Sequence, residues 1–165
     1  LDVGGGEGRF LAAGAARAPQ LRLMLLDLPA VAERARARLA AAGLAARATC
    51  IGGDFLREPL PLGADIVTLV RVVHDHDDGP ALALLRAVRR ALPADGALLL
   101  AEPMADTPGA EPVGAYFAFY LLAMGSGRPR RDVELRAMLD AAGFRRSRLL
   151  ATRRPLLTRV ILAQP

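Results

Sequence analysis

Leu1-Asp2-Val3-Gly4-Gly5-Gly6-Glu7-Gly8 opens the chain and joins the end of an apolar strand to a glycine-rich turn, after which a helical pattern begins. Glycine has no Cβ atom, so a turn of this kind can adopt positive φ values and lets a ligand approach the backbone. The following helix offers N–H groups that lack partners within the helix. The stretch predicts a site for a nucleotide-like ligand, although a turn that only lets strand and helix pack is an alternative.

The register of these glycines disfavours a nicotinamide dinucleotide as the ligand. The dinucleotide fingerprint is G-x-G-x-x-G, and counted from Gly4 and Gly6 its third glycine position is occupied by Arg9. An NAD-dependent dehydrogenase is therefore the weaker hypothesis.

The length and composition indicate one globular domain. The chain has 165 residues, of which 53% are hydrophobic, so it can bury a substantial core. It starts without a methionine inside a predicted strand, and we expect a fragment whose N-terminal part is missing. No apolar run approaches the length of a membrane-spanning helix, and the single cysteine, Cys50, excludes an internal disulfide framework. We expect a cytoplasmic protein.

The net charge of +5 comes entirely from arginine, because the chain has no lysine. The arginines are spread in small groups between acids and alanines, for example at 34–38, 89–90 and 128–131. No aromatic and basic module of the kind that binds nucleic acid accompanies them. We therefore expect solvated arginine side chains and no nucleic-acid partner, with contact to an anionic membrane surface as the lesser alternative.

Short apolar runs alternate with helical patterns along most of the chain. Helices are expected over residues 10–17, 31–41, 81–92 and 133–142. Strands are expected over residues 1–3, 21–26, 46–51, 66–73, 97–101, 144–150 and 156–163. This alternation predicts an α/β fold with a mostly parallel sheet covered on both faces. The last two strands follow each other without a helix, which predicts an antiparallel addition at the sheet edge.

Polar side chains follow the predicted strands at the positions where they end. In a parallel sheet these carboxyl ends meet at one edge, where ligands bind. Asp27 follows the second strand about twenty residues after the glycine turn, where a carboxylate can accept hydrogen bonds from ribose hydroxyls. The other strand-end residues are Asp54, Phe55, the run from His74 to Asp78, and Glu102. Each acid taken alone could instead cap a helix or turn, or lie in solvent.

The run His74-Asp75-His76-Asp77-Asp78 also allows a hydrolase metal site, since alternating histidine and aspartate side chains can bind zinc or a metal pair. The chain has only these two histidines, so further imidazole ligands are missing. We therefore expect no metal at this loop.

These motifs, in this order, resemble those of a known enzyme family. The segments concerned are Leu1 to Gly8, Asp27-Leu28-Pro29, Gly53-Asp54-Phe55, Leu69 to Asp78 and Glu102-Pro103. The chain resembles the S-adenosylmethionine-dependent small-molecule O-methyltransferases of the caffeate and acetylserotonin type over essentially its whole length. The resemblance implies that family's catalytic domain and its Rossmann-like class I methyltransferase fold, a mostly parallel seven-stranded sheet with an antiparallel C-terminal strand.

The resemblance also implies S-adenosylmethionine as the cofactor. The residues that would contact it, from its methionine part to its adenine, are Gly4, Gly6, Gly8, Asp27, Leu28, Asp54 and Phe55, with Arg71 nearby. The glycines would hold the methionine part and Asp27 the ribose hydroxyls. Leu28, Asp54 and Phe55 would contact the adenine.

By the same resemblance, His74 is the general base, Asp75 is an acid beside it, and Glu102 orients the imidazole. A second glutamate that flanks the histidine in the family is absent, because its position falls on Pro129, so we expect Glu102 alone to orient His74. His76 stands where many relatives have tryptophan. Methyl transfer is an in-line displacement, so the protein has mainly to align the acceptor oxygen and remove its proton. With an aliphatic alcohol, deprotonation should accompany C–O bond formation.

An aromatic cluster follows Glu102, and in it Tyr116, Tyr120 and Met124 fall on one helical face. Ordinary core packing is one explanation of this face, and a substrate pocket is the other. The cluster and residues 154–160 resemble the bacterial hydroxyneurosporene (spheroidene) O-methyltransferases of carotenoid synthesis. This resemblance implies a hydroxylated carotenoid as acceptor and a homodimer formed through a helical N-terminal domain. The alternatives are a phenolic or polyketide acceptor, or a binding module without catalysis.

Overall fold

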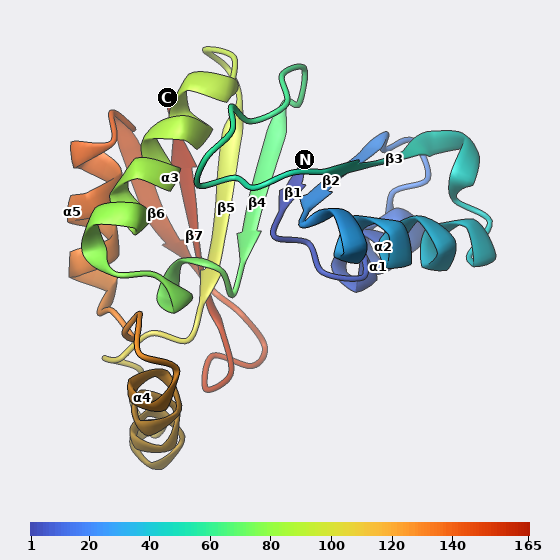
Figure 1. Cartoon of the computed structure of the whole chain (residues 1–165). Helices are drawn as coiled ribbons and strands as arrows, with labels where there is room; N and C mark the ends of the chain where they lie inside the picture. The colour runs from blue at the N-terminus through green and yellow to red at the C-terminus, as the bar shows by residue number, and fades with distance from the viewer.

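A twisted seven-stranded sheet forms the centre of the computed structural model, which describes all residues from Leu1 to Pro165 (Figure 1). The strands are β1 Asp2–Val3, β2 Leu23–Asp27, β3 Ala48–Gly52, β4 Ile66–Val70, β5 Ala97–Glu102, β6 Arg146–Leu150 and β7 Arg159–Gln164. The helices are α1 Arg9–Arg17, α2 Pro29–Ala41, α3 Asp78–Ala91, α4 Glu111–Met124 and α5 Asp132–Ala141, with short 3₁₀ turns η1 Ala45–Arg47 and η2 Val73–Asp75. The predicted α/β class with seven strands is confirmed.

The strand order is β3-β2-β1-β4-β5-β7-β6. The first five strands in this order are parallel, and β7 is antiparallel to both of its neighbours, β5 and β6. The predicted antiparallel addition of the two C-terminal strands at the sheet edge is confirmed. Strand β7 enters between β5 and β6, because the chain turns back after β6 and pairs on both sides, so that β6 becomes the edge strand.

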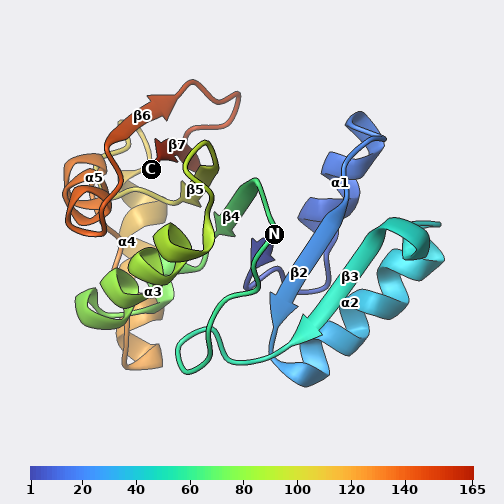
Figure 2. The same ribbon diagram turned by 90° about the horizontal axis from the view of Figure 1, so that it is seen from above.

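Side chains that alternate along β2 supply two separate cores, one on each face of the sheet. Leu25 lies in a cluster with Leu11 of α1 and Leu39 of α2. Its neighbour Leu26 points into the larger cluster, which includes Leu85 of α3. Figure 2 shows α1 and α2 gathered around β2 and β3, and α3 and α5 around the other half of the sheet. Both faces are thus covered by helices, as the alternating pattern predicted.

Two predicted strand boundaries are wrong, and each has a local cause. The strand predicted over 66–73 ends at Val70, because Arg71 adopts a left-handed conformation with φ 59° and η2 follows. The strand predicted over 156–163 begins at Arg159. Before it, the N–H groups of Leu157 and Thr158 donate to the carbonyl of Arg154, which makes a turn in place of a ladder.

Helix α4 lies beyond the carboxyl ends of the central strands, apart from the helices that cover the sheet (Figure 1). Its fourteen residues contain one buried side chain, Leu121. Helix α2 begins at Pro29, two residues before its apolar pattern, because proline has the φ angle of a first helical residue and needs no N–H partner there. None of the helices combines the length and apolar character required to cross a membrane.

Candidate active site

The glycine turn has the backbone conformation that its sequence predicts. Gly4, Gly6 and Gly8 have φ values of 67°, 56° and 75°. A Cβ atom at Gly4 would lie 2.8 Å from a methyl carbon of Val72, so this position requires glycine for close packing as well. At Gly6 a Cβ atom would meet nothing within 4 Å. The turn is therefore packed against the protein at Gly4 and open beside Gly6, where a ligand can approach the backbone.

Asp27 fixes the end of β2 to this turn. Its Oδ2 accepts a hydrogen bond from the N–H of Gly6 at 2.8 Å, and its Oδ1 accepts one from the N–H of Leu28 at 2.8 Å. The side chain of Leu28 is exposed beside it. The structure thus brings Asp27 and the glycine turn together, as their places at two neighbouring strand ends predicted.

Asp54 and Phe55 follow β3 and have different surroundings. Asp54 Oδ1 accepts a hydrogen bond from the N–H of Leu56 at 2.9 Å, so this carboxylate stabilises a turn, which was one of its two predicted roles. The Phe55 ring meets the His76 ring edge-on, with 5.7 Å between centroids. It also lies 3.6 Å from the position of a Cβ atom on Gly4. Phe55 therefore lies between the glycine turn and the histidine loop.

Asp2 is a polar group of this site that the sequence analysis treated only as a strand residue. It is 1% exposed; its Oδ1 accepts a hydrogen bond from the Thr68 hydroxyl at 2.6 Å, whereas Oδ2 has no partner. A Cβ atom on Gly5 would lie 2.7 Å from Oδ2, which places the carboxylate directly against the turn. Burial away from water raises the pKa of Asp2 to about 6. A carboxylate inside a short apolar strand was the available signal.

His74 and Glu102 form a buried pair at the ends of β4 and β5. The two residues are 5% and 2% exposed, and Glu102 Oε2 lies 2.5 Å from His74 Nδ1. Glu102 Oε1 accepts hydrogen bonds from the N–H groups of Val72 and Val73, at 3.0 and 2.8 Å. One carboxylate therefore holds both the imidazole and the backbone of η2. With the proton on Nδ1, the other ring nitrogen, Nε2, is left to accept a proton.

Asp75 lies on the opposite side of the imidazole. Its Oδ1 is 3.1 Å from His74 Nε2, and its side chain is half exposed. The expectation that Glu102 alone orients His74 is therefore incomplete, because a carboxylate faces each ring nitrogen. Each ring nitrogen of His74 thus has a carboxylate oxygen within hydrogen-bonding distance. The pKa of the neighbouring His76 is lowered, chiefly by burial.

Helix α4 reaches the imidazole through Phe117, which the sequence analysis did not select. The Phe117 and His74 rings meet edge-on with centroids 4.8 Å apart, and Tyr120 stacks on Phe117 at 5.9 Å. The Arg71 guanidinium lies over the Phe117 ring, 5.4 Å from its centroid. Of the predicted pocket residues, Tyr120 is thus joined to the site through Phe117, whereas Tyr116 and Met124 are 74% and 64% exposed. The spacing of three residues between Phe117 and Tyr120 was the missed signal.

Arg71 holds an unusual backbone conformation beside these rings. It is the one residue other than glycine with a positive φ, and its N–H donates to the carbonyl of Ala101 at 2.8 Å. Such a conformation costs free energy in a residue with a Cβ atom, and such residues concentrate at functional sites. The strain marks the point where the chain leaves β4 for the histidine loop.

Fold and site together define a class of protein: a Rossmann-like α/β domain with a glycine turn of positive φ values and a buried histidine–glutamate pair at the same edge of its sheet. A sequence profile of the O-methyltransferase domain matches residues 1–145. The chain belongs to this family, which confirms the resemblance inferred from its motifs.

Named relatives agree with this assignment. The chain is 46% identical over 166 residues to the demethylspheroidene O-methyltransferase of Cereibacter sphaeroides, covering 99% of the chain and 43% of the relative. It is 44% identical over 148 residues to the aclacinomycin 10-hydroxylase of Streptomyces purpurascens, covering 87% and 39%. An O-methyltransferase of neocarzinostatin biosynthesis, solved with S-adenosylmethionine and 2-hydroxy-5-methyl naphthoic acid, superposes with a TM-score of 0.85 at 31% identity, covering 99% and 47%. The chain spans somewhat less than half the length of these relatives.

Proposed function

We propose that this domain binds S-adenosylmethionine and transfers its methyl group to a hydroxyl of an apolar small molecule, with His74 as the general base. The observation that carries the proposal is the buried His74–Glu102 pair at the sheet edge where the glycine turn lies. The match to the O-methyltransferase family profile and the relative named demethylspheroidene O-methyltransferase support the same reaction.

The open side of the glycine turn fits the proposed cofactor. The space beside Gly6 and the unpartnered carboxylate oxygen of Asp2 suit a ligand that carries positive charge and lies against the backbone. Gly4, Gly6, Gly8 and Asp27 would hold its methionine and ribose parts. The residues assigned to its adenine side are Leu28, Asp54 and Phe55, with Arg71 near them. When bound, the cofactor supplies a methyl carbon that its sulfonium makes electrophilic.

His74 would remove the proton of the acceptor hydroxyl. Glu102 keeps the Nδ1 proton in place and leaves Nε2 free to accept the proton, and Asp75 stabilises the imidazolium that results. An aliphatic hydroxyl is far too weakly acidic to be ionised beforehand by an imidazole. The proton therefore moves to Nε2 as the new C–O bond forms, and alignment of the hydroxyl oxygen supplies most of the acceleration.

The acceptor is proposed to be a hydroxylated carotenoid. The support is the demethylspheroidene O-methyltransferase relative and the apolar side chains that α4 presents beyond the base. Phe117 and Tyr120 would lie along its polyene, and Tyr116 and Met124 further out on the helix. A phenolic acceptor would need the same base but less apolar surface.

Partners and location are further parts of this proposal. We infer a homodimer formed through the additional length that the relatives possess, a cytoplasmic location, and peripheral contact with the membrane from which a carotenoid would be taken. The exposed apolar side chains of α4 support a binding surface there.

Calorimetric titration with S-adenosylmethionine, with NAD as control ligand and Asp27→Ala as control variant, tests the cofactor. Binding of S-adenosylmethionine alone, weakened in the variant, is expected. Incubation of the intact protein with cofactor and hydroxylated carotenoids or small phenols then tests the acceptor. The product mass is measured, because one relative is named a hydroxylase. A gain of oxygen in place of a methyl group, or methylation of phenols alone, would overturn the proposed reaction or acceptor respectively.

A further inference from the structure

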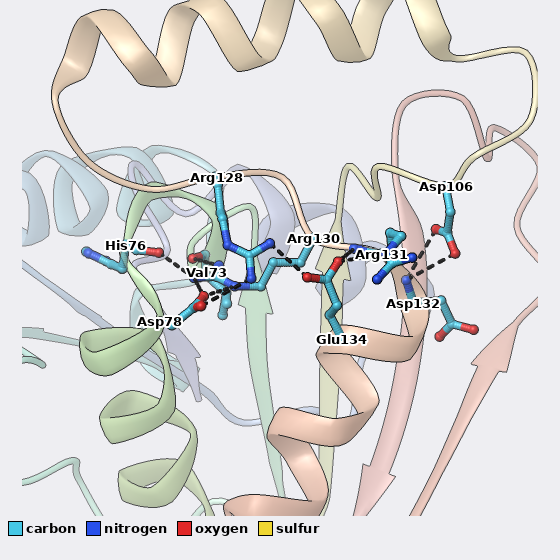
Figure 3. Close-up of polar contacts among 9 residues, drawn as sticks. All are labelled: Val73, His76, Asp78, Asp106, Arg128, Arg130, Arg131, Asp132 and Glu134. Carbon is cyan, nitrogen blue, oxygen red and sulfur yellow. Dashed lines mark hydrogen bonds and ion pairs between the residues drawn. The ribbon is translucent and has the colours of Figure 1, made fainter.

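Arg130 is the largest fully buried side chain of the domain, although its neighbours in the sequence predicted a solvated arginine. Figure 3 shows its guanidinium beside Val73, His76 and Asp78. Nη1 donates to the carbonyl of Val73 at 2.9 Å, and Nη2 donates to the carbonyl of His76 at 2.7 Å. Nε donates to Asp78 Oδ1 at 2.9 Å. The expectation of a solvated side chain is therefore wrong for Arg130, which donates hydrogen bonds to backbone carbonyls before and after His74.

The residues before Arg130 contact the same loop. The Ser126 hydroxyl donates to the carbonyl of Asp75 at 3.1 Å, and the N–H of Gly127 donates to Asp77 Oδ1 at 3.0 Å. Gly127, at φ 82°, lies so close to the loop that a Cβ atom there would come within 2.6 Å of the carbonyl carbon of Asp75. We call the three residues Ser126, Gly127 and Arg130 the clasp. It contacts the loop at the carbonyls of Val73, Asp75 and His76 and at the side chain of Asp77.

The clasp and Glu102 hold complementary groups of one loop. Glu102 accepts from the N–H groups of Val72 and Val73, and Arg130 donates to the carbonyls of Val73 and His76. The carboxylate therefore pairs two N–H groups at the start of the 3₁₀ turn, and the guanidinium pairs the carbonyl of His76 and adds a second hydrogen bond to the carbonyl of Val73, which also accepts the N–H of His76. Both charged groups are buried and hydrogen-bonded, so moving either one would cost free energy.

We propose that Arg130 is a positioning residue for the general base: it fixes the backbone that carries His74, so that Nε2 stays where the acceptor hydroxyl must meet it. The inference rests on the proposed function. The inference explains how His74 is held without the family's second glutamate. Pro129 stands at the position expected for that glutamate, and the next side chain, Arg130, hydrogen-bonds to the loop. The contacts of Glu102 and Asp75 with the imidazole fix the orientation of the ring. The contacts of Arg130 with the backbone fix the position of the segment that carries it.

The planar fork of arginine is required for this role. Two carbonyls three residues apart and one carboxylate are reached by separate N–H groups of one rigid group, whereas a lysine ammonium is a point donor on a flexible stem. Arg130→Lys retains the charge opposite Asp78 and loses the defined pair of carbonyl contacts. Arg128 offers a matched control, because it also pairs with Asp78, at 3.1 Å, but is 44% exposed and does not touch the loop backbone.

The test compares Arg130→Lys with Arg128→Gln in the intact protein. Arg130→Lys should lower kcat for the acceptor roughly 10- to 100-fold, as expected for a displaced reacting group, and leave the S-adenosylmethionine dissociation constant nearly unchanged. In spectra of protein labelled with ¹⁵N-histidine, the His74 imidazole signals, assigned by their loss in His74→Gln, should shift or broaden. Arg128→Gln should alter neither measurement.

Equal kcat and unchanged His74 signals in Arg130→Lys and Arg128→Gln would overturn the inference. If Arg130→Lys does not fold, Gly127→Ala decides, because it displaces the same loop from the other contact and should give the same two effects. The imidazole spectrum also separates this inference from the proposed function: signals that move in a protein that transfers no methyl group support the positioning role and contradict the reaction.

Discussion

The glycine turn and helix α4 both follow the carboxyl ends of strands, but the chain fixes the first and leaves the second exposed. At the turn, Gly6 is hydrogen-bonded to Asp27, and Gly4 packs on Val72. In α4, one of fourteen side chains is buried, and large apolar side chains face solvent. These are Val113, Tyr116, Phe119, Tyr120, Leu122 and Met124.

The difference separates the two parts of the proposed reaction. The proposed cofactor site is assembled from contacts within this chain, whereas the proposed acceptor surface is an apolar helix most of whose side chains the chain leaves uncovered. Exposed apolar surface of this extent marks a binding site. A cofactor that all members of a family share can bind in a site formed within one domain. An acceptor that differs between members can bind on a surface that a further segment or molecule completes. The predictions below test this separation.

The largest effect is expected at the base. His74→Ala removes the proposed general base and should lower kcat roughly 10²–10⁴-fold. The dissociation constant of S-adenosylmethionine, measured by calorimetry, should stay close to that of the wild type, because His74 belongs to the acceptor side. Full turnover in this variant would contradict the assignment of the base, and lost cofactor binding would contradict the separation.

A smaller effect is expected at Asp27, and it concerns the affinity for S-adenosylmethionine and not the catalytic rate. Asp27→Asn keeps an oxygen for the N–H of Gly6 but removes the charge that ribose hydroxyls would meet. A charge-assisted hydrogen bond contributes about 1.5–3 kcal/mol, so the dissociation constant for S-adenosylmethionine should rise roughly 10- to 100-fold in calorimetry. Asp140→Asn, on the far helix α5, serves as control. Equal affinities in the two variants would show that Asp27 does not contact the cofactor.

Asp2 should make the stability of the glycine-turn region depend on pH. Because burial raises its pKa to about 6, the folded state holds a proton that the unfolded state has released, and the free energy of unfolding falls as the pH rises toward 6. The cost reaches at most about 3 kcal/mol above that pH. Urea unfolding from pH 4 to 7.5 should show that the stability of Asp2→Asn relative to the wild type increases with pH. A constant difference would mean that Asp2 does not titrate in this range.

The smallest effect is expected on the exposed helix. Phe119 is 72% exposed, so Phe119→Ser should change the free energy of unfolding by no more than about 0.5 kcal/mol. Leu121→Ala, at the buried position of the same helix, is the control and should destabilise the domain measurably in urea. A large loss of stability in Phe119→Ser would show that α4 is already covered within the domain.

Local motifs explain why the cofactor side could be predicted from the sequence. The nearness of the glycine turn and Asp27 follows from the rule that strand ends of a parallel sheet meet at one edge, whereas the pairing of His74 with Glu102 was expected only from the family resemblance. Asp2 was within the first stretch considered, but its burial depends on Thr68, 66 residues away.

The acceptor side depends on contacts between distant segments, and there sequence reasoning failed. Arg130 lies among exposed arginines, and only the loop 54–57 residues earlier makes it buried. Phe117 and Tyr116 are adjacent aromatic residues, and periodicity does not say which one meets His74. The position of β7 between β5 and β6 similarly depends on which edge the returning chain pairs with.

The clasp joins two parts of the domain along the chain. Helix α4 ends at Met124, and Gly125 is the one residue between the helix and the clasp. Ser126, Gly127 and Arg130 then hydrogen-bond to the loop that carries His74. The exposed apolar helix is thus tethered to that loop by a segment of a few residues.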